Sequence, residues 1–126
     1  MTKNCIYKIE GLQGCKKLDI LLIGENRLGL DENISEVEAL KGLLECPSLS
    51  TLDISKNHLK DPEILPQILE KMENLTVLYC KGNDFVRKIS NYRKTLIYKI
   101  PTLQYLDERP VTEEERRRAI AFGVGQ

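Results

Sequence analysis

The residues of this sequence whose side chains could do chemistry are four cysteines, one histidine and many carboxylates. Such side chains can bind a metal, and a cysteine or serine beside a base can act as a nucleophile. No two cysteines have the short spacing of zinc ligands, and no serine or cysteine has an evident base partner. Gly11 and Gly14 are isolated, so they do not form a glycine-rich phosphate loop. We therefore predict no catalytic, cofactor or metal site, and we expect that the protein is not an enzyme.

Asparagines at Asn26, Asn57 and Asn83 mark a pattern that occurs three times. Each asparagine follows apolar residues at eight, five and three positions upstream and precedes another at two positions downstream. This is the leucine-rich-repeat pattern, and three copies in one register are strong support for it. The copies are Leu18-x-x-Leu21-x-Ile23-x-x-Asn26-x-Leu28, Leu49-x-x-Leu52-x-Ile54-x-x-Asn57-x-Leu59 and Leu75-x-x-Leu78-x-Cys80-x-x-Asn83-x-Phe85.

The pattern predicts how these residues are positioned. Leu21 and Ile23 alternate with outward residues, so they point inward from one short strand. Each asparagine amide should bond turn backbone groups that would otherwise be buried without partners. Because one unit cannot bury its own apolar face, neighbouring units must stack into a solenoid.

The expected fold class is therefore α/β. We predict a single leucine-rich-repeat domain over 1–126, with a short parallel sheet on the concave face, helices on the convex side and a C-terminal helical cap. Its predicted parts are a partial repeat at about 4–17, repeats at 18–48, 49–74 and 75–102, and a cap at about 103–122, with capping structure beginning near residue 91.

The cysteines fit the apolar positions of the pattern. Cys15 and Cys46 stand three residues before the first leucine of their repeats, where methionine and isoleucine stand in later repeats, and Cys80 replaces an isoleucine. We expect these three to be core residues with reduced thiols, as suits an intracellular protein, whereas Cys5 is undetermined. His58 follows an asparagine and should face solvent in a turn.

Helix-start signals recur after the strands. Pro66 should disturb the first turns of the second helix. The expected helices run over 36–45, from Asp61 to about Met72, over 91–99 and over 113–121, capped by Ser35, Asp61, Ser90 and Thr112. The side chains expected to face the core are Val37, Leu40, Leu44, Tyr92, Leu96, Ile100, Ala119, Ile120 and Phe122.

The strand of Leu21 should lie at or near the edge of the sheet, because residues 4–17 resemble the back half of a repeat whose strand is missing. An uncovered edge strand is prone to pair with another chain. Two interpretations are open. Either residues 1–8 cover the edge or upstream sequence has been lost, or a partner or a second copy binds there.

The outward side chains of the strands form columns on the predicted concave face. A contiguous exposed apolar surface commonly marks an interface, and tyrosines are frequent anchors in interfaces. We expect a partner-binding surface there, although the same residues could simply pack against one another. Its predicted residues are Ile20, Thr51, Val77 and Tyr105 in one column, and Leu22, Asp53, Tyr79 and Asp107 in the next.

Composition and charge narrow the classes of partner. The 126 residues carry no net charge, so no overall field draws the protein to nucleic acid or membrane. No apolar run approaches the ~20 residues of a transmembrane helix. Basic residues near the third repeat give only a weak nucleic-acid signal: Lys81, Arg87, Lys88, Arg93, Lys94 and Lys99. We expect protein partners, no membrane and no nucleic acid.

Three stretches of the C-terminal half resemble the leucine-rich-repeat dynein axonemal assembly factors. They are Leu59-Lys60-Asp61-Pro62-Glu63-Ile64-Leu65, Val86-Arg87-Lys88-Ile89-Ser90-Asn91-Tyr92-Arg93-Lys94-Thr95-Leu96 and Leu103-Gln104-Tyr105-Leu106-Asp107-Glu108-Arg109-Pro110-Val111. Asn91-Tyr92-Arg93 with Leu106-Asp107 is shared with other capped families, including the spliceosomal A-prime protein. Compared with the dynein factors, this chain has fewer N-terminal repeats and ends soon after the cap, as expected of a domain fragment or a shortened protein.

The resemblance implies a non-enzymatic cytoplasmic scaffold for cilium or flagellum biogenesis. Members of that family help axonemal dynein arms to preassemble in the cytoplasm. The implied partners are axonemal dynein subunits, chaperones or other assembly factors. The alternative that it leaves open is a capped leucine-rich-repeat subunit of a spliceosomal-type RNA–protein particle.

Overall fold

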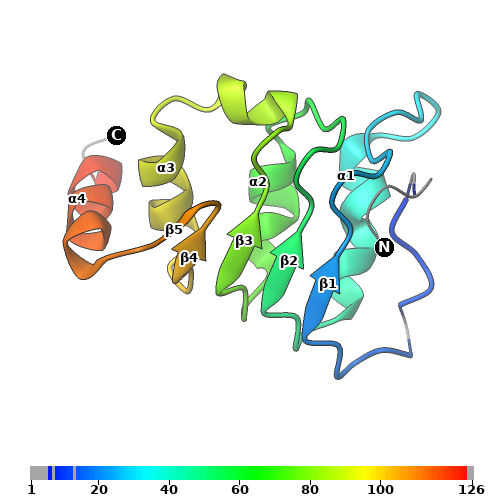
Figure 1. The fold of residues 1–126 in the computed structure, drawn as a ribbon, viewed down its shortest axis with the longest axis horizontal. Helices are drawn as coiled ribbons and strands as arrows, with labels where there is room; N and C mark the ends of the chain where they lie inside the picture. The colour runs from blue at the N-terminus through cyan, green and yellow to red at the C-terminus, as the bar shows by residue number, and fades with distance from the viewer. Residues whose placement is uncertain (1–5, 7, 13, 125–126) are drawn as a thin grey trace.

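A single sheet runs through the molecule (Figure 1). We describe the protein from a computed structural model that covers residues 6, 8–12 and 14–124. The first four strands pair in parallel and the last returns antiparallel, which confirms the predicted sheet with Leu21, Leu52 and Leu78 side by side. In sheet order the strands are β1 (Ile20–Leu22), β2 (Thr51–Asp53), β3 (Val77–Tyr79), β4 (Tyr105–Leu106) and β5 (Arg109–Pro110).

Each buried asparagine ties its own turn to the neighbouring repeat. Asn57 Nδ2 donates to Ile54 O at 3.0 Å in its own repeat and to Ile23 O at 3.1 Å in the preceding one. Its Oδ1 accepts from Leu28 N at 3.1 Å, and Asn83 makes the equivalent bonds one repeat later. These backbone groups are closed off from water, so the amides supply partners that solvent cannot. The predicted role of the asparagines is confirmed, and it extends across repeats.

The residue before each asparagine has a left-handed backbone. The φ angles are 56° at Glu25, 52° at Lys56 and 88° at Gly82. A left-handed backbone costs a non-glycine residue roughly 1 kcal/mol or more, so two of these turns persist against their local preference. The asparagine bonds that follow in the chain offset this cost.

The convex side carries short helices behind the sheet (Figure 1). The predicted 36–45 helix is present, and Ser35 Oγ accepts from Glu38 N as its cap. Its second half is a 3₁₀ helix with about three residues per turn, so Leu43 follows Leu40 into the core. Leu44 was predicted to face the core, and this is wrong, because it is exposed. The helical elements are α1 (Glu36–Leu40), η1 (Lys41–Glu45), α2 (Ile64–Gln67), η2 (Leu69–Lys71), η3 (Asp84–Lys88), α3 (Tyr92–Lys99) and α4 (Glu113–Val124).

Two predicted helix starts differ in detail from the structure. The helix expected from Asp61 begins at Ile64, and Asp61 Oδ1 accepts from Glu63 N in the preceding turn. It then changes to 3₁₀ geometry after Pro66, which has no N–H to donate within the helix. Ser90 was predicted to cap α3, and this is wrong, because Asn91 stands at the N-cap position and no side chain bonds the first turn as a cap.

The C-terminal cap is a pair of packed helices, α3 and α4. Thr112 Oγ1 accepts from Glu115 N, as the capping signal predicts. Arg93 donates to both carboxylate oxygens of Glu115, at 2.8 and 3.0 Å, and so joins the two helices. Ala119 is buried as expected, but Ile120 was wrongly expected to face the core, because it lies on the exposed face of α4. Helix α4 closes the end of the apolar core.

The described cysteines differ in burial according to the repeat that holds them. Cys46 and Cys80 are buried in the core, as predicted. Cys15 was predicted to be a core residue, and this is wrong, because it precedes the edge strand and is exposed. Cys5 lies outside the described residues, and His58 is exposed, as expected.

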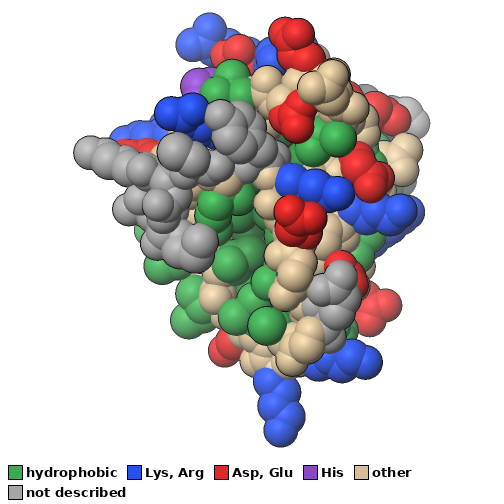
Figure 2. Space-filling view, turned by 90° about the vertical axis from the view of Figure 1, so that its right-hand side faces the viewer, with side chains coloured by type: hydrophobic (Ala, Val, Ile, Leu, Met, Phe, Trp, Pro, Cys, Tyr) green, Lys and Arg blue, Asp and Glu red, His purple; other side chains and the backbone are tan. Residues whose placement is uncertain are grey.

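Strand β1 is the first strand of the sheet, which confirms its predicted edge position among the described residues. The backbone hydrogen bonds of Ile6 are made to residues that follow β1, not to the strand itself. Its N–H donates to Asn26 Oδ1, and its carbonyl accepts from Arg27 N. Hydrophobic side chains gather on this end of the molecule (Figure 2). The expectation that residues 1–8 cover the edge lies largely outside the described residues. No helix in the described ranges has the length and apolar character needed to span a bilayer.

We predict that Asn57→Ala lowers the free energy of unfolding by about 2–4 kcal/mol, because one buried acceptor bond and several donor bonds are lost together. Urea unfolding monitored by circular dichroism measures this. The neighbouring exposed residue provides the control: His58→Ala should change stability by no more than about 0.5 kcal/mol. Equal effects of the two substitutions would contradict the role given to the asparagine.

We also predict a pH dependence from the α3–α4 contact. The Arg93 guanidinium, bonded to the Glu115 carboxylate, lowers the pKa of Glu115. A carboxyl with a lowered folded pKa stabilises the protein above its unfolded pKa of about 4.3, and loses this contribution as the pH falls through the folded pKa. Glu115→Gln should therefore cost about 1–2 kcal/mol at neutral pH and nothing in stronger acid.

Thermal unfolding across pH 2–7 tests this second prediction. Glu114→Gln is the matched control, because its bond to Arg118 is exposed and should contribute little. A Glu115→Gln deficit that stays constant down to the lowest pH would show that charge at Glu115 does not hold the cap.

Candidate functional site

The concave columns predicted from the repeat register are present. Ile20 pairs with Thr51, Thr51 with Val77, and Val77 with Tyr105. Leu22 pairs with Asp53, and Asp53 in turn with Tyr79. Because alternate strand residues point to opposite faces, these side chains lie opposite the buried leucines at the strand centres. The stack therefore brings together residues that are up to 85 positions apart in the chain.

This surface is apolar at one end and aromatic at the other. Ile20 and Leu22 on the edge strand are 54% and 47% exposed. Tyr79 and Tyr105 contact each other, with ring centroids 5.8 Å apart and planes tilted by 52°. Between the two ends, Asp53 accepts from Ser55 N and Oγ. Whether a partner binds these residues stays a prediction, but their exposure and arrangement permit it.

Asp107 departs from the predicted surface. We expected it to project outward beside Tyr79, but it is buried, and its backbone has a φ of 58°. Its Oδ1 accepts from Cys80 N at 2.9 Å and Lys81 N at 3.0 Å, so its carboxylate bonds the backbone that follows strand β3 in the preceding repeat. The left-handed turn comes early in this last repeat and rotates the side chain inward. Asp107 thus belongs to the cap, and the candidate surface is reduced to seven residues.

A hydrogen-bonded chain links Asp107 to the core. Tyr92 donates its hydroxyl proton to Asp107 Oδ2 at 2.7 Å. Cys80 Sγ lies 2.7 Å from the same hydroxyl oxygen, so its thiol is the donor in that contact. Burial raises the pKa of the Cys80 thiol far above its usual value, and burial likewise raises the pKa of Tyr92. Both groups therefore remain neutral at physiological pH and act as structural donors.

Ion pairs neutralise basic residues beside the surface. Lys81 Nζ lies 2.8 Å from Glu108 Oε1, and the bond to Glu108 raises the pKa of Lys81. Arg93 is held by Glu115 and by the carbonyl of Leu106. Sequence reasoning missed these pairings. A signal existed only for the first, because Glu108 stands in the repeat position that an apolar residue or cysteine fills in the earlier copies. Two of the six basic residues that gave a nucleic-acid signal are thus engaged within the protein.

The described residues contain no group of three histidine, cysteine or acidic side chains that could hold a metal. Every buried side-chain nitrogen or oxygen in this part of the chain has a hydrogen-bond partner.

We predict that Asp107→Ala destabilises the protein by about 2–4 kcal/mol, because it leaves the buried Cys80 N–H, the partly buried Lys81 N–H and the Tyr92 hydroxyl without their acceptor. Glu108→Ala should have a much smaller effect, because its bond to Lys81 is exposed to solvent. Thermal melting of both variants distinguishes them. A fully stable Asp107→Ala protein that loses only partner binding would instead support the outward position expected from the sequence.

Two solved structures resemble this fold. A chain of the Drosophila melanogaster SNF/U2A′ complex matches with a TM-score of 0.75 and 26% identity, covering 97% of this chain and 65% of that one. A chain of the Chaetomium Mex67:Mtr2 subunits matches with a TM-score of 0.61 and 21% identity, covering 90% of this chain and 69% of that one. The second likeness concerns the fold alone.

Three relatives have a higher sequence identity to this chain than these two structures have. The leucine-rich repeat-containing protein ODA7 of Chlamydomonas reinhardtii is 46% identical over 71% of this chain. The human dynein axonemal assembly factor 1 is 46% identical over 68%, and its Drosophila melanogaster homologue is 42% identical over 77%. This chain spans only 20%, 12% and 6% of their respective lengths. The predicted resemblance to dynein axonemal assembly factors is confirmed.

The model of the leucine-rich-repeat family matches residues 1–124. This repeat is the one that forms the sheet and the asparagine turns described above. Sequence match and architecture agree, and the chain belongs to the leucine-rich-repeat family.

Proposed function

We propose that this protein is a non-enzymatic protein-binding scaffold that acts in the cytoplasmic preassembly of axonemal dynein arms for cilia or flagella. The observation that supports it is the 46% and 42% identity to the human and Drosophila melanogaster proteins named dynein axonemal assembly factor 1, over two thirds or more of this chain. Its partners are axonemal dynein subunits, chaperones or other assembly factors.

The concave face is the proposed contact surface. Ile20 and Leu22 offer an apolar patch open to solvent, and Tyr79 with Tyr105 offers a paired aromatic patch. Apolar and aromatic groups of this kind supply most of the energy in protein interfaces. Asp53 lies between the patches. The surface suits a protein segment that has apolar side chains at both ends and a basic or hydrogen-bond-donating group between them.

The second candidate is a subunit of an RNA–protein particle. The likeness to a chain of the SNF/U2A′ complex favours it. In such a role this protein would hold a protein partner rather than RNA, because Lys81 and Arg93 already bind Glu108 and Glu115. Higher identity to the assembly-factor relatives makes dynein preassembly the preferred proposal.

We predict that affinity purification of the tagged protein from ciliated source cells recovers axonemal dynein chains and chaperones. A Tyr79→Ala/Tyr105→Ala double variant should lose roughly 30-fold or more in affinity for the main partner, because truncated aromatic anchors commonly cost about 2 kcal/mol or more. Quantitative mass spectrometry of the purified complexes measures the loss, and circular dichroism shows whether the variant still folds.

The matched control is Gln67→Ala/Lys71→Ala, a pair of exposed convex positions that should leave recovery unchanged. Recovery of splicing proteins in place of dynein chains would support the second candidate. Unchanged dynein recovery by the tyrosine variant would place the contact elsewhere on the molecule.

A further inference from the structure

Cys15 and Cys46 occupy equivalent positions in adjacent repeats. Each stands five residues before a paired strand position, since Ile20 lies opposite Thr51. Each also begins the same turn, because Leu18 N donates to Cys15 O at 3.0 Å and Leu49 N donates to Cys46 O at 3.1 Å. The paired strands that follow lie about 4.8 Å apart, and Cys15 and Cys46 stand in the equivalent turns that lead into them. A disulfide requires Cα atoms about 4.4–6.8 Å apart, so neighbouring turns of this kind are suitable places for one.

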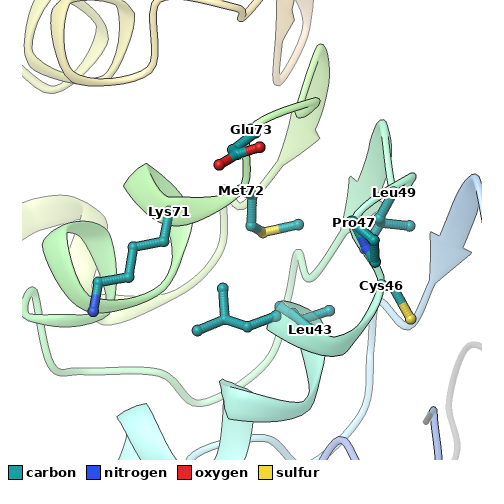
Figure 3. A pocket seen from close by; sticks show the side chains of 8 residues that line it. Leu43, Cys46, Pro47, Leu49, Lys71, Met72 and Glu73 are labelled. Atoms are coloured by element: carbon teal, nitrogen blue, oxygen red, sulfur yellow. The ribbon is translucent and has the colours of Figure 1, made fainter. Parts of the chain in front are cut away.

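Both cysteines donate to the same carbonyl oxygen, that of Leu12. Leu12 O accepts from Cys15 N at 2.9 Å and from the Cys46 thiol at 3.8 Å. The Cys46 sulfur is directed away from Met72, its counterpart in the next repeat (Figure 3). The Cys46 sulfur therefore lies on the side of the residue that faces the turn before strand β1.

Exposure differs between the two thiols. Cys15 is exposed, whereas Cys46 is only 3% exposed. Burial, and next the nearby Cys15 thiol, raise the pKa of Cys46. An oxidant in solution therefore reaches Cys15 first, and Cys46 is positioned to react with the product.

We propose that Cys15 and Cys46 form a reversible intramolecular disulfide under peroxide stress, a modification site that joins the edge repeat to the second repeat. The Cys15 thiolate attacks a peroxide oxygen and the O–O bond breaks, which gives a cysteine sulfenic acid and, after protonation, water. The Cys46 sulfur then attacks the Cys15 sulfur, the S–O bond breaks, and the hydroxyl leaves with the Cys46 proton as a second water. Two thiols lose two electrons, and the peroxide gains them.

The disulfide changes the end of the solenoid that is least constrained. Strand β1 has a neighbour on only one side in the described part of the chain, so its repeat opens more easily than the inner ones. A link across the turn between the two repeats restricts this opening. Because Ile20 and Leu22 lie on the same edge strand, oxidation also holds the apolar end of the concave face in place.

Peptide mass spectrometry tests this proposal. Trypsin places each of the four cysteines on a separate peptide, and Cys15 and Cys46 lie on peptides 9–16 and 42–56. The whole chain is treated with hydrogen peroxide, free thiols are blocked, and the digest is compared with and without reductant. We expect a cross-linked 9–16/42–56 peptide that Cys15→Ser removes and Cys80→Ser leaves in place. Oxidised wild type should melt roughly 5–10 °C above the reduced form, with no such shift in Cys15→Ser.

Several outcomes would overturn the proposal. A link of Cys15 to peptide 4–8, which carries Cys5, or between two chains through Cys15, would show that Cys46 is not its partner. Over-oxidation of Cys15 with Cys46 still free would show the same. Cys15→Ser alters an exposed side chain, so its fold should be retained, and Cys46→Ala gives a second variant with an apolar replacement. An oxidation-dependent rise in melting temperature that persists in either variant contradicts the assignment.

Discussion

The bond from a buried asparagine amide to a carbonyl of the preceding repeat is the interaction on which the rest of this structure depends. Asn57 reaches Ile23 O, and Asn83 reaches Ile54 O, so each turn is completed by its neighbour. A short strand has little stability alone, and the left-handed backbone of Glu25 and Lys56 opposes two of the three turns. The amides offset this cost and also keep the repeats in one register. The concave columns of side chains exist because that register is kept.

The two ends of the stack differ in what bonds the backbone groups of the outermost repeat. At the C-terminal end, Asp107 takes over the part played by a following repeat, and accepts from Cys80 N and Lys81 N. Helix α4 then covers the apolar core, and Arg93 fastens it through Glu115. At the other end, β1 is a sheet edge with two exposed apolar side chains. Within the described residues, the stack is therefore capped at its C-terminal end and begins with an edge strand at the other.

This asymmetry bears on the proposed contact surface. The tyrosine pair lies near the rigid cap, whereas Ile20 and Leu22 lie on the edge strand. A partner that contacts both ends would bind a firm aromatic site and a more adaptable apolar one. Such a partner would also stabilise the edge repeat, because binding favours the state in which both ends are ordered. This fits a scaffold that holds client proteins during assembly, as we propose for this chain.

The sequence by itself was enough to predict the repeat register, the parallel sheet and the buried asparagines. Those features follow from spacing, because a two-residue alternation and a turn-bonding amide act within a few residues of the chain. The same local reasoning found Thr112 as a helix cap and Tyr79 and Tyr105 in adjacent columns.

Only the tertiary structure decided where the pattern changes at its ends. Cys15 fills the same position as Cys46 but is exposed, because no repeat packs on its outer side within the described residues. Asp107 turned inward because its carboxylate is the acceptor for two amides that lie 26 and 27 residues away. Leu44 and Ile120 became exposed through helix geometry and packing. In each case the outcome depends on which distant groups are left without a partner, and spacing along the chain does not carry that information.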